Sequence, residues 1–139
     1  PRASRRSWFE SVLEDIADGT CSTLERAYLD RVERAHALPR AHRQRPGRAR
    51  VGVPQRDVDY DPLPLIVELD SRLFHDNAEQ RDVDLDRDLD AAVDGRVTIR
   101  IGWGQVFDRP CRTAGRVAAL LVRAGWTGRA RRCGPDCRL

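Results

Sequence analysis

The sequence contains no lysine, no methionine and no long apolar segment. All 25 basic residues are arginine, so any site that ordinarily uses lysine must be built without it. No apolar run approaches the roughly 18 residues of a membrane-spanning helix, and residues 1–10 lack the form of a signal peptide. These absences predict a cytoplasmic protein that does not enter a membrane. Without an initial methionine, the chain is expected to be processed at Pro1 or to be the C-terminal part of a longer protein.

The residues that are present describe a single globular domain. A length of 139 residues is enough to bury a core, and hydrophobic and charged residues make up 40% and 34% of the chain. Within this domain we expect an N-terminal helix in 1–21, a core in 22–126 and a basic, cysteine-containing tail in 127–139.

Apolar spacing, capping patterns and β-branched content divide the core into elements. We expect helices at about 7–18, 22–37, 77–94 and 113–124, strands at 56–60, 65–70 and 96–101, and a turn at 61–64. In the second helix, Leu24, Tyr28 and Val32 form an apolar stripe; in the third, Leu85 and Leu89 repeat at the same spacing. This order predicts an α/β domain with a small mixed sheet flanked by helices.

Charge is distributed unevenly along the chain. Residues 57–94 contain 13 acidic residues and 3 arginines, a local charge of −10, so the remainder carries +13 and the whole chain +3. Residues 31–50 contain seven arginines and two histidines. An arginine-rich surface beside an acidic pocket suits a partner with a phosphate backbone. An arginine run is, however, more often only a solvated face.

Two acidic residues, Glu68 and Asp70, end the apolar run at 63–69. Residues two apart in a strand share a face, so these side chains point the same way. Asp59 lies on the preceding strand of the expected hairpin and can approach them. Converging carboxylates repel unless a divalent cation lies between them, and hard oxygen ligands select Mg²⁺ or Mn²⁺. Arginine partners are the alternative; without metal, one carboxylate should have a raised pKa or recruit an arginine.

Asp59, the stretch Glu68-Leu69-Asp70 and His75 together resemble the site of PD-(D/E)XK nucleases. More closely, residues 22–126 are similar to small endonuclease-like domains related to very-short-patch-repair endonucleases, common in actinobacteria. The segments that carry the resemblance are STLE at 22–25, VELDSRLFH at 67–75, DLDRD at 84–88 and VTIRIGW at 97–103. The resemblance implies a restriction-endonuclease-like core.

The resemblance also implies roles for individual residues. Asp59 and Glu68 would bind the catalytic metal, Asp70 would be a ligand or support one, and His75 would act as a base or position water. Glu25 matches an acid on the first conserved helix of such nucleases, although it also completes a capping box. A histidine at this point without the preceding acids would be an ordinary strand-end residue.

Some positions depart from the family pattern or have a second explanation. Asp70 stands where the family motif has lysine, Ser71 replaces a glycine, and Arg96 replaces an aromatic residue. Arg87 and Arg100 match basic positions near the site. Both are more natural as ion-pair partners for the acids than as groups that stabilise a transition state.

Cysteine occurs four times, as Cys21, Cys111, Cys133 and Cys137. The spacing Cys133-x-x-x-Cys137 is typical of zinc ligands, and Cys21 and Cys111 each precede an expected helix. A cytoplasmic protein is not expected to rely on disulfides. The four cysteines are therefore either the ligands of a structural Zn²⁺ that ties the tail to the domain, or separate free thiols.

Two functions are consistent with these patterns. The first is a Mg²⁺-dependent DNA endonuclease that hydrolyses phosphodiester bonds, with backbone contacts from four arginines: Arg43, Arg45, Arg48 and Arg50. The second is a catalytically silent nuclease-fold module that binds nucleic acid or a protein partner in a regulator or antitoxin-like protein. The surroundings of Asp59 separate the two, because nearby carboxylates in an open cleft favour the enzyme and an arginine in that space favours the module.

Overall fold

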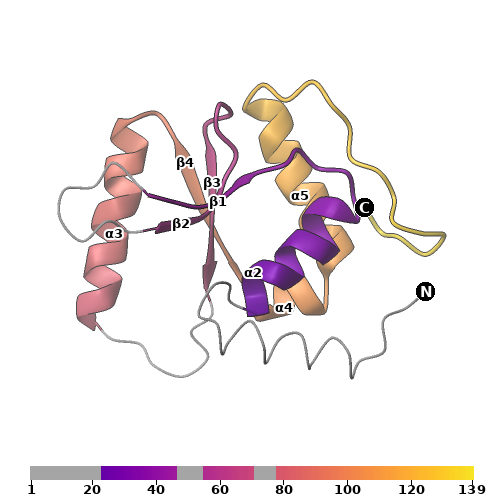
Figure 1. The fold of residues 1–139 in the computed structure, drawn as a ribbon, viewed down its shortest axis with the longest axis horizontal. Helices are drawn as coiled ribbons and strands as arrows, with labels where there is room; N and C mark the ends of the chain where they lie inside the picture. The colour runs from indigo at the N-terminus through magenta and orange to yellow at the C-terminus, as the bar shows by residue number, and fades with distance from the viewer. Residues whose placement is uncertain (1–22, 47–54, 71–77) are drawn as a thin grey trace.

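The computed structural model describes residues 23–46, 55–70 and 78–139. Four strands form one sheet in the order β1 (His42–Pro46), β2 (Gln55–Asp59), β3 (Leu65–Asp70) and β4 (Val97–Gly102). The first three are antiparallel neighbours, and β4 runs parallel to β3. In Figure 1, α3 (Ala78–Val93) lies on one side of the sheet, and α2 (Thr23–Tyr28), α4 (Trp103–Phe107) and α5 (Pro110–Arg123) lie on the other. The predicted α/β fold with a small mixed sheet is confirmed.

The first described helical segment packs against the sheet through its predicted apolar stripe. α2 continues directly into η1 (Leu29–Arg34), a π-helical segment. Leu24, Tyr28 and Val32 are fully buried, because residues four apart lie on one side of a helix. The segment ends at Arg34, and in the turn that follows, Ala37 has a φ of 53°, in the left-handed region, which directs the chain toward β1.

β1 is a strand that the sequence analysis did not predict. Its sequence, HRQRP, contains no β-branched or aromatic residue, so strand propensity gives no signal. It forms because it pairs along β2, with Arg43 opposite Val58. Arg43 therefore lies on the same face of the sheet as Val58, toward the helices, and its guanidinium lies 5.6 Å from the ring centroid of Tyr28.

The predicted hairpin of β2 and β3 is confirmed, with Val58 opposite Val67. The turn between the strands contains a cis peptide bond at Asp61–Pro62. Alternation along β3 gives the sheet two chemically different faces. One face carries Leu65, Val67 and Leu69 into the main core, and the other carries Ile66, Glu68 and Asp70.

α3 is confirmed as a helix, but the apolar repeat that predicted it faces solvent. Leu85, Leu89 and Val93 have exposed fractions of 58%, 64% and 81%. The helix meets the sheet through other residues. Ala91 is buried. The Asp88 carboxylate, which is partly exposed, accepts a hydrogen bond from Arg100 of β4 at 3.0 Å. The contact between α3 and β4 thus includes an ion pair beside its apolar packing.

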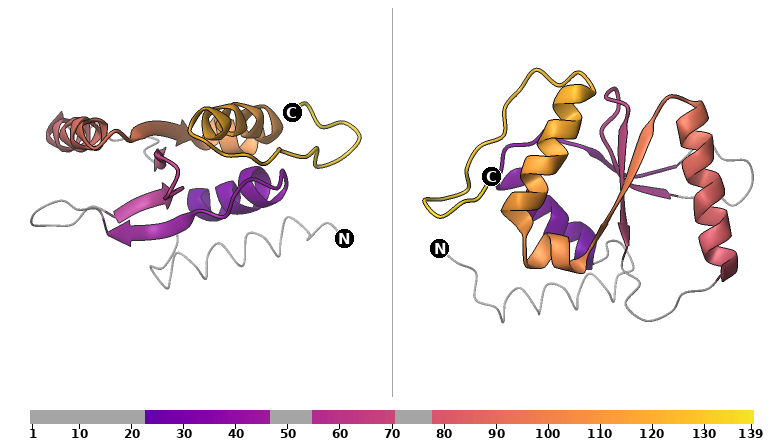
Figure 2. Two further views of the ribbon diagram at one scale, coloured as in Figure 1. Left: turned by 90° about the horizontal axis from the view of Figure 1, so that it is seen from above. Right: turned by 180° about the vertical axis from the view of Figure 1, so that it is seen from behind.

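The C-terminal part returns along the helical side of the molecule. Pro110 begins α5 at a position that suits proline. α5 ends at Arg123, and Gly125, with a φ of 110°, then turns the chain so that Trp126 N donates to Leu121 O at 2.8 Å. The tail then runs beside α5 without helix or strand, back toward the end of η1 (Figure 2). α4 was not predicted.

A buried polar network joins η1, β1 and β2. Glu33 has an exposed fraction of 2%, and its carboxylate accepts hydrogen bonds from Arg43 Nη2 at 3.2 Å and from the Tyr60 hydroxyl at 3.3 Å. The Tyr28 and Tyr60 hydroxyl oxygens are 2.9 Å apart. Burial raises the pKa of Glu33, and the charge of Arg43 opposes this shift without cancelling it.

We expect Glu33→Gln to be most destabilising at acidic pH. Because the pKa of Glu33 is raised above its ordinary value of 4.5, the folded state binds the proton more tightly than the unfolded state. The stabilisation that comes from binding this proton is complete below the pKa that Glu33 has in the unfolded chain. It is lost as the pH rises through the pKa that Glu33 has in the folded protein. Glutamine does not titrate. Urea unfolding of both proteins at about pH 4 and about pH 7 measures their free energies of unfolding. The difference between wild type and Glu33→Gln should be larger at about pH 4 than at about pH 7. A difference that grows with pH would contradict the raised pKa.

Candidate metal centre

Three cysteines and one histidine from separate segments meet at one point. His36 follows η1, Cys111 lies in the first turn of α5, and Cys133 and Cys137 lie in the tail. One potential ligand atom from each residue lies within 4.8 Å of all the others. The Sγ atoms of Cys111 and Cys133 are 3.5 Å apart, and Cys137 Sγ is 3.6 Å from His36 Nε2. This cluster could hold a metal ion.

A hydrogen bond on the far side of the imidazole orients His36. The residue is fully buried, and its Nδ1 lies 3.0 Å from Val32 O. A carbonyl oxygen can only accept, so this contact assigns the proton to Nδ1. Nε2, the nitrogen left to bind a metal ion, faces Cys137 Sγ. Metal-binding histidines are commonly held in this way by a second hydrogen bond.

Hydrogen bonds within the cluster make its thiols unequal. Burial by itself would raise the pKa of the Cys137 thiol, but hydrogen bonds from the Cys133 backbone and from the Cys111 and Cys133 side chains outweigh it and lower the pKa to about 6. The pKa of Cys133 is raised to about 11, chiefly by its hydrogen bond with Cys111. One negative charge is thus favoured and a second is resisted. A cation would remove that resistance, because it attracts every sulfur.

The tail is organised around the same cluster. Arg131 N donates to His36 O at 2.8 Å. Arg132 Nη2 donates to Pro135 O and Cys137 O, both at 2.9 Å, and thereby closes the loop between the two tail cysteines. An ion bound by the four residues would therefore fasten a segment without helix or strand to the ends of η1 and α5.

The sequence analysis predicted three of these four residues. Cys111, Cys133 and Cys137 are brought together, whereas Cys21 lies outside the described residues. His36 was missed because it lies 101 residues before Cys137, and no local spacing connects them. The sequence did limit the candidates. A pair of tail cysteines with zinc-ligand spacing needs two more cysteine or histidine ligands, and with only three histidines in the chain each one was a candidate.

The predicted carboxylates lie on the opposite face of the sheet. Glu68 and Asp70 share a face of β3 with Ile66, and Asp59 of β2 stands directly opposite Ile66. Asp59 is thus diagonal to Glu68, a relation that separates residues by about 7–8 Å. Among the described residues, the Cys/His cluster is the only set of three or more potential ligands brought close enough to hold an ion.

Arg96 forms an ion pair with the carboxylate of Asp59. Arg96 donates to both carboxylate oxygens, and the Asp61 backbone N–H donates to one of them at 2.9 Å. The Asp59 side chain is almost fully buried in this pair. Gly95, with a φ of 74°, follows the end of α3 and sets Arg96 immediately before β4. Recruitment of an arginine is one of the two outcomes expected of metal-free carboxylates at this position.

Asp57 is an acidic residue near the predicted site that the sequence analysis missed. Its Oδ2 accepts a hydrogen bond from Leu69 N at 2.7 Å, next to Glu68 in the chain. Burial raises the pKa of Asp57, and the negative charge of Glu25 on α2 raises it further. Asp57 therefore lies near Glu25 and the end of β3. The available signal was its position two residues before Asp59 in the same predicted strand.

The two arginines predicted near the site acids lie close to two other acidic residues, Asp88 and Asp57. Arg100 pairs with Asp88 at 3.0 Å. The positive charge of Arg87 lowers the pKa of Asp57, although burial prevails and the net shift is upward. Both positions fit ion-pair partners of the acidic residues.

Of the four arginines predicted to contact phosphates, Arg43 turns inward to Glu33 and is about one-fifth exposed. Arg45 lies on β1 opposite Arg56 of β2. Arg48, Arg50 and also His75 lie outside the described residues.

Comparisons with known proteins return no relative. No family model matches the chain, and neither do the curated proteins or the solved structures. Within the described residues, no helix combines the length and the apolar character needed to cross a bilayer. A functional proposal must therefore rest on the fold, the Cys/His cluster and the acidic residues.

Proposed function

We propose that this protein is a zinc-stabilised DNA endonuclease that uses a second divalent cation for cleavage. The mixed sheet with helices on both sides fits the restriction-endonuclease-like core that the sequence resemblance implies. The observation that carries the catalytic proposal is the meeting of Glu25, Asp57 and the end of β3, which bears Glu68 and Asp70. Acidic residues from α2, β2 and β3 therefore lie near the same end of the hairpin, although no three of them among the described residues are already close enough to hold an ion.

The chemistry of the acidic residues suits Mg²⁺ or Mn²⁺. Asp57 joins Asp59, Glu68 and Asp70 as a candidate ligand, and all are hard oxygen donors. Such an ion, when bound, polarises the scissile phosphate and lowers the pKa of the attacking water. The raised pKa of Asp57 and the pairing of Asp59 with Arg96 are both ways to reduce like-charge repulsion without metal.

For the Cys/His cluster we propose Zn²⁺. Three thiols and one imidazole are the soft and intermediate ligands that zinc prefers. In a tetrahedral site with Zn–S bonds of about 2.3 Å, sulfur atoms lie about 3.8 Å apart. The separation of 3.5 Å between Cys111 Sγ and Cys133 Sγ is close to this value. With a Zn–N bond of about 2.0–2.1 Å, a sulfur and a nitrogen lie about 3.6 Å apart, as Cys137 Sγ and His36 Nε2 do. Four protein ligands leave no open position for a substrate, so the ion is structural.

We expect supercoiled plasmid to be nicked when Mg²⁺ or Mn²⁺ is added and to stay intact with Ca²⁺ or with no added ion. The zinc-loaded full chain should be used, so that the fold is complete in every lane. Gel electrophoresis measures the conversion. Cleavage that needs no added ion, or no cleavage with any ion, would contradict the catalytic proposal.

A catalytically silent module is the second candidate, and the pairing of Arg96 with Asp59 favours it. If that pair is permanent, Mg²⁺ has no access to Asp59. An NMR titration with Mg²⁺ separates the two functions. The endonuclease should show shifts concentrated in residues 57–59 and 68–70, whereas a module that only binds a partner should show none in those strands.

A further inference from the structure

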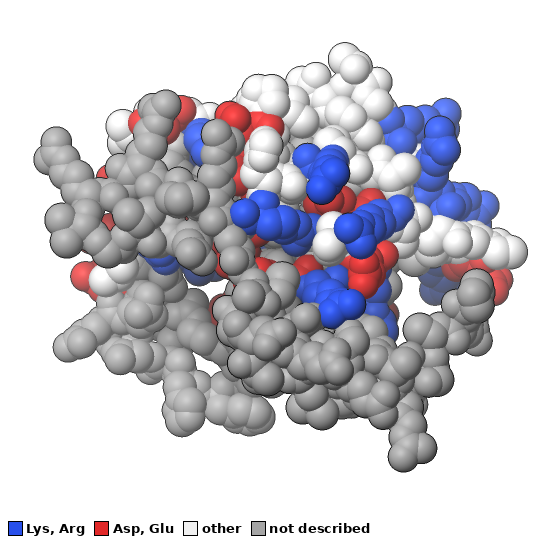
Figure 3. All heavy atoms as spheres, viewed as in Figure 1, with Lys and Arg blue, Asp and Glu red and all other residues white. Residues whose placement is uncertain are grey.

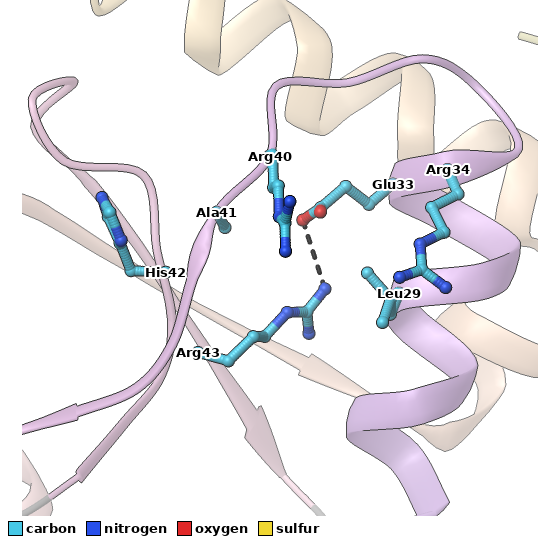
Figure 4. A pocket seen from close by; sticks show the side chains of 7 residues that line it. All are labelled: Leu29, Glu33, Arg34, Arg40, Ala41, His42 and Arg43. Atoms are coloured by element: carbon cyan, nitrogen blue, oxygen red, sulfur yellow. Dashed lines mark hydrogen bonds and ion pairs between the residues drawn. The ribbon is translucent and has the colours of Figure 1, made fainter.

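A basic pocket of about 440 Å³ lies between η1 and β1. In the space-filling view of Figure 3, arginine side chains gather around acidic ones on the face that carries these elements. Figure 4 shows three arginines directed toward a common space from η1, the connecting segment and β1. Three arginines and one glutamate give the lining a charge of 3 − 1 = +2, with histidine neutral. The lining residues are Leu29, Glu33, Arg34, Arg40, Ala41, His42 and Arg43.

Arg43 is held rigidly at the inner side of this pocket. Its Nη2 donates to Glu33 Oε2 at 3.2 Å and its Nη1 to Glu25 O at 3.4 Å. Its Nε, by contrast, is buried and has no hydrogen-bond partner in the described part of the chain. A buried N–H without a partner is costly, and a ligand oxygen or a water molecule is the usual remedy. The guanidinium is thus fixed in place with one donor unsatisfied.

The other two arginines are available to a ligand. Arg40 is exposed and makes no hydrogen bond or ion pair within the described part of the chain. Arg34 pairs with Asp30 through Nη1 at 3.2 Å, and both side chains are about half exposed or more. Surface pairs of this kind contribute little and exchange readily. Both guanidinium groups can turn toward an anion in the pocket.

The chemistry of the lining identifies a phosphate group as the ligand. Guanidinium groups present paired N–H donors that match the oxygens of a phosphate, which also carries enough charge to balance two unneutralised arginines. The volume lies within the range of small-molecule sites and holds more than a bare ion. Leu29 and Ala41 supply an apolar wall for a sugar or a base.

We infer that this pocket binds a phosphate group of a nucleic acid or a nucleotide, with Arg34 and Arg40 contacting its oxygens beside the fixed Arg43. The inference deepens the proposed function, on which it rests for the source of the phosphate. On an endonuclease, the pocket would hold the substrate backbone at a point outside the acidic residues of the proposed cleavage site.

The test compares Arg40→Gln with Arg123→Gln. Both remove one positive charge from an exposed side chain, but Arg123 lies on α5 and does not line the pocket. Fluorescence anisotropy with a labelled short duplex and equilibrium dialysis with a nucleoside monophosphate measure binding. We expect Arg40→Gln to weaken duplex binding about tenfold, and Arg123→Gln less than about twofold. The log–log salt slope should fall by about 1 for Arg40→Gln.

The two probes identify the source of the phosphate. A specific loss for the duplex alone indicates a backbone phosphate, and a specific loss for both probes indicates a nucleotide or a chain end. If Arg40→Gln and Arg123→Gln weaken binding equally, or if neither weakens it, the inference is overturned. In both cases the pocket contributes no more to binding than the rest of the charged surface. If wild type does not cleave plasmid but Arg40→Gln still shows the specific loss, the proposed activity fails and the pocket stands.

Discussion

Cys137→Ser should lower the free energy of unfolding by at least about 4 kcal/mol, the stabilisation given by a ligand present at about 1,000 times its dissociation constant. Zinc binds only where the folded chain brings His36, Cys111, Cys133 and Cys137 together, so its binding energy stabilises the fold. A chelator should also lower the melting temperature of the wild-type protein, because it removes the same zinc ion. Thermal unfolding with and without chelator measures both effects.

The matched control is Cys21→Ser, which makes the same change at the one cysteine that is not among the four proposed ligands. It should keep the wild-type melting temperature and its sensitivity to chelator. His36→Ala should instead behave like Cys137→Ser and lose that sensitivity. Equal melting temperatures for wild type and Cys137→Ser, with and without chelator, would show that the cluster holds no stabilising ion.

Glu68→Gln should reduce metal-dependent nicking at least about 100-fold. Loss of a residue that only supports a metal ligand lowers activity by up to about 100-fold, and loss of the ligand itself should lower it at least as much. It should leave the fold intact or stabilise the metal-free protein slightly, since one of several neighbouring like charges is removed. Cleavage and melting temperature are therefore expected to change independently. A nicking assay with Mg²⁺ and a melting curve without added metal measure them.

The opposite pattern identifies a structural role. If Glu68 balances an arginine, its loss leaves that arginine unpaired and destabilises the fold by about 1–3 kcal/mol. Asp88→Asn is the matched control, because it removes a carboxylate paired with Arg100 on the same side of the sheet. It should keep cleavage. A large drop in melting temperature for Glu68→Gln, with cleavage retained, would defeat the catalytic proposal.

The elements that were predicted from the sequence are those whose signals are local. β3 follows from an apolar, β-branched run after a proline turn, and α5 from an apolar repeat that ends at glycine. β1 and α4 carry no such signal. β1 is defined by its pairing with β2, and α4 is a single short turn after β4 whose Gln105 side chain accepts from Gly102 N at 2.9 Å.

Orientation and long-range partners were harder to predict. The repeat of Leu85, Leu89 and Val93 is correct for a helix, yet periodicity cannot tell which side meets the sheet. His36 reaches the cysteines only through the returning tail. Arg96 reaches Asp59 only because β4 crosses back beside β3. These contacts depend on topology, which local pattern does not contain.

The most direct measurement for the metal centre is native mass spectrometry, with elemental analysis, of protein purified without added metal. We expect about one zinc ion per chain in wild type and in Cys21→Ser, and none in His36→Ala or Cys137→Ser. A metal-free wild-type chain in which Cys111 and Cys133 are joined as a disulfide would contradict the zinc site.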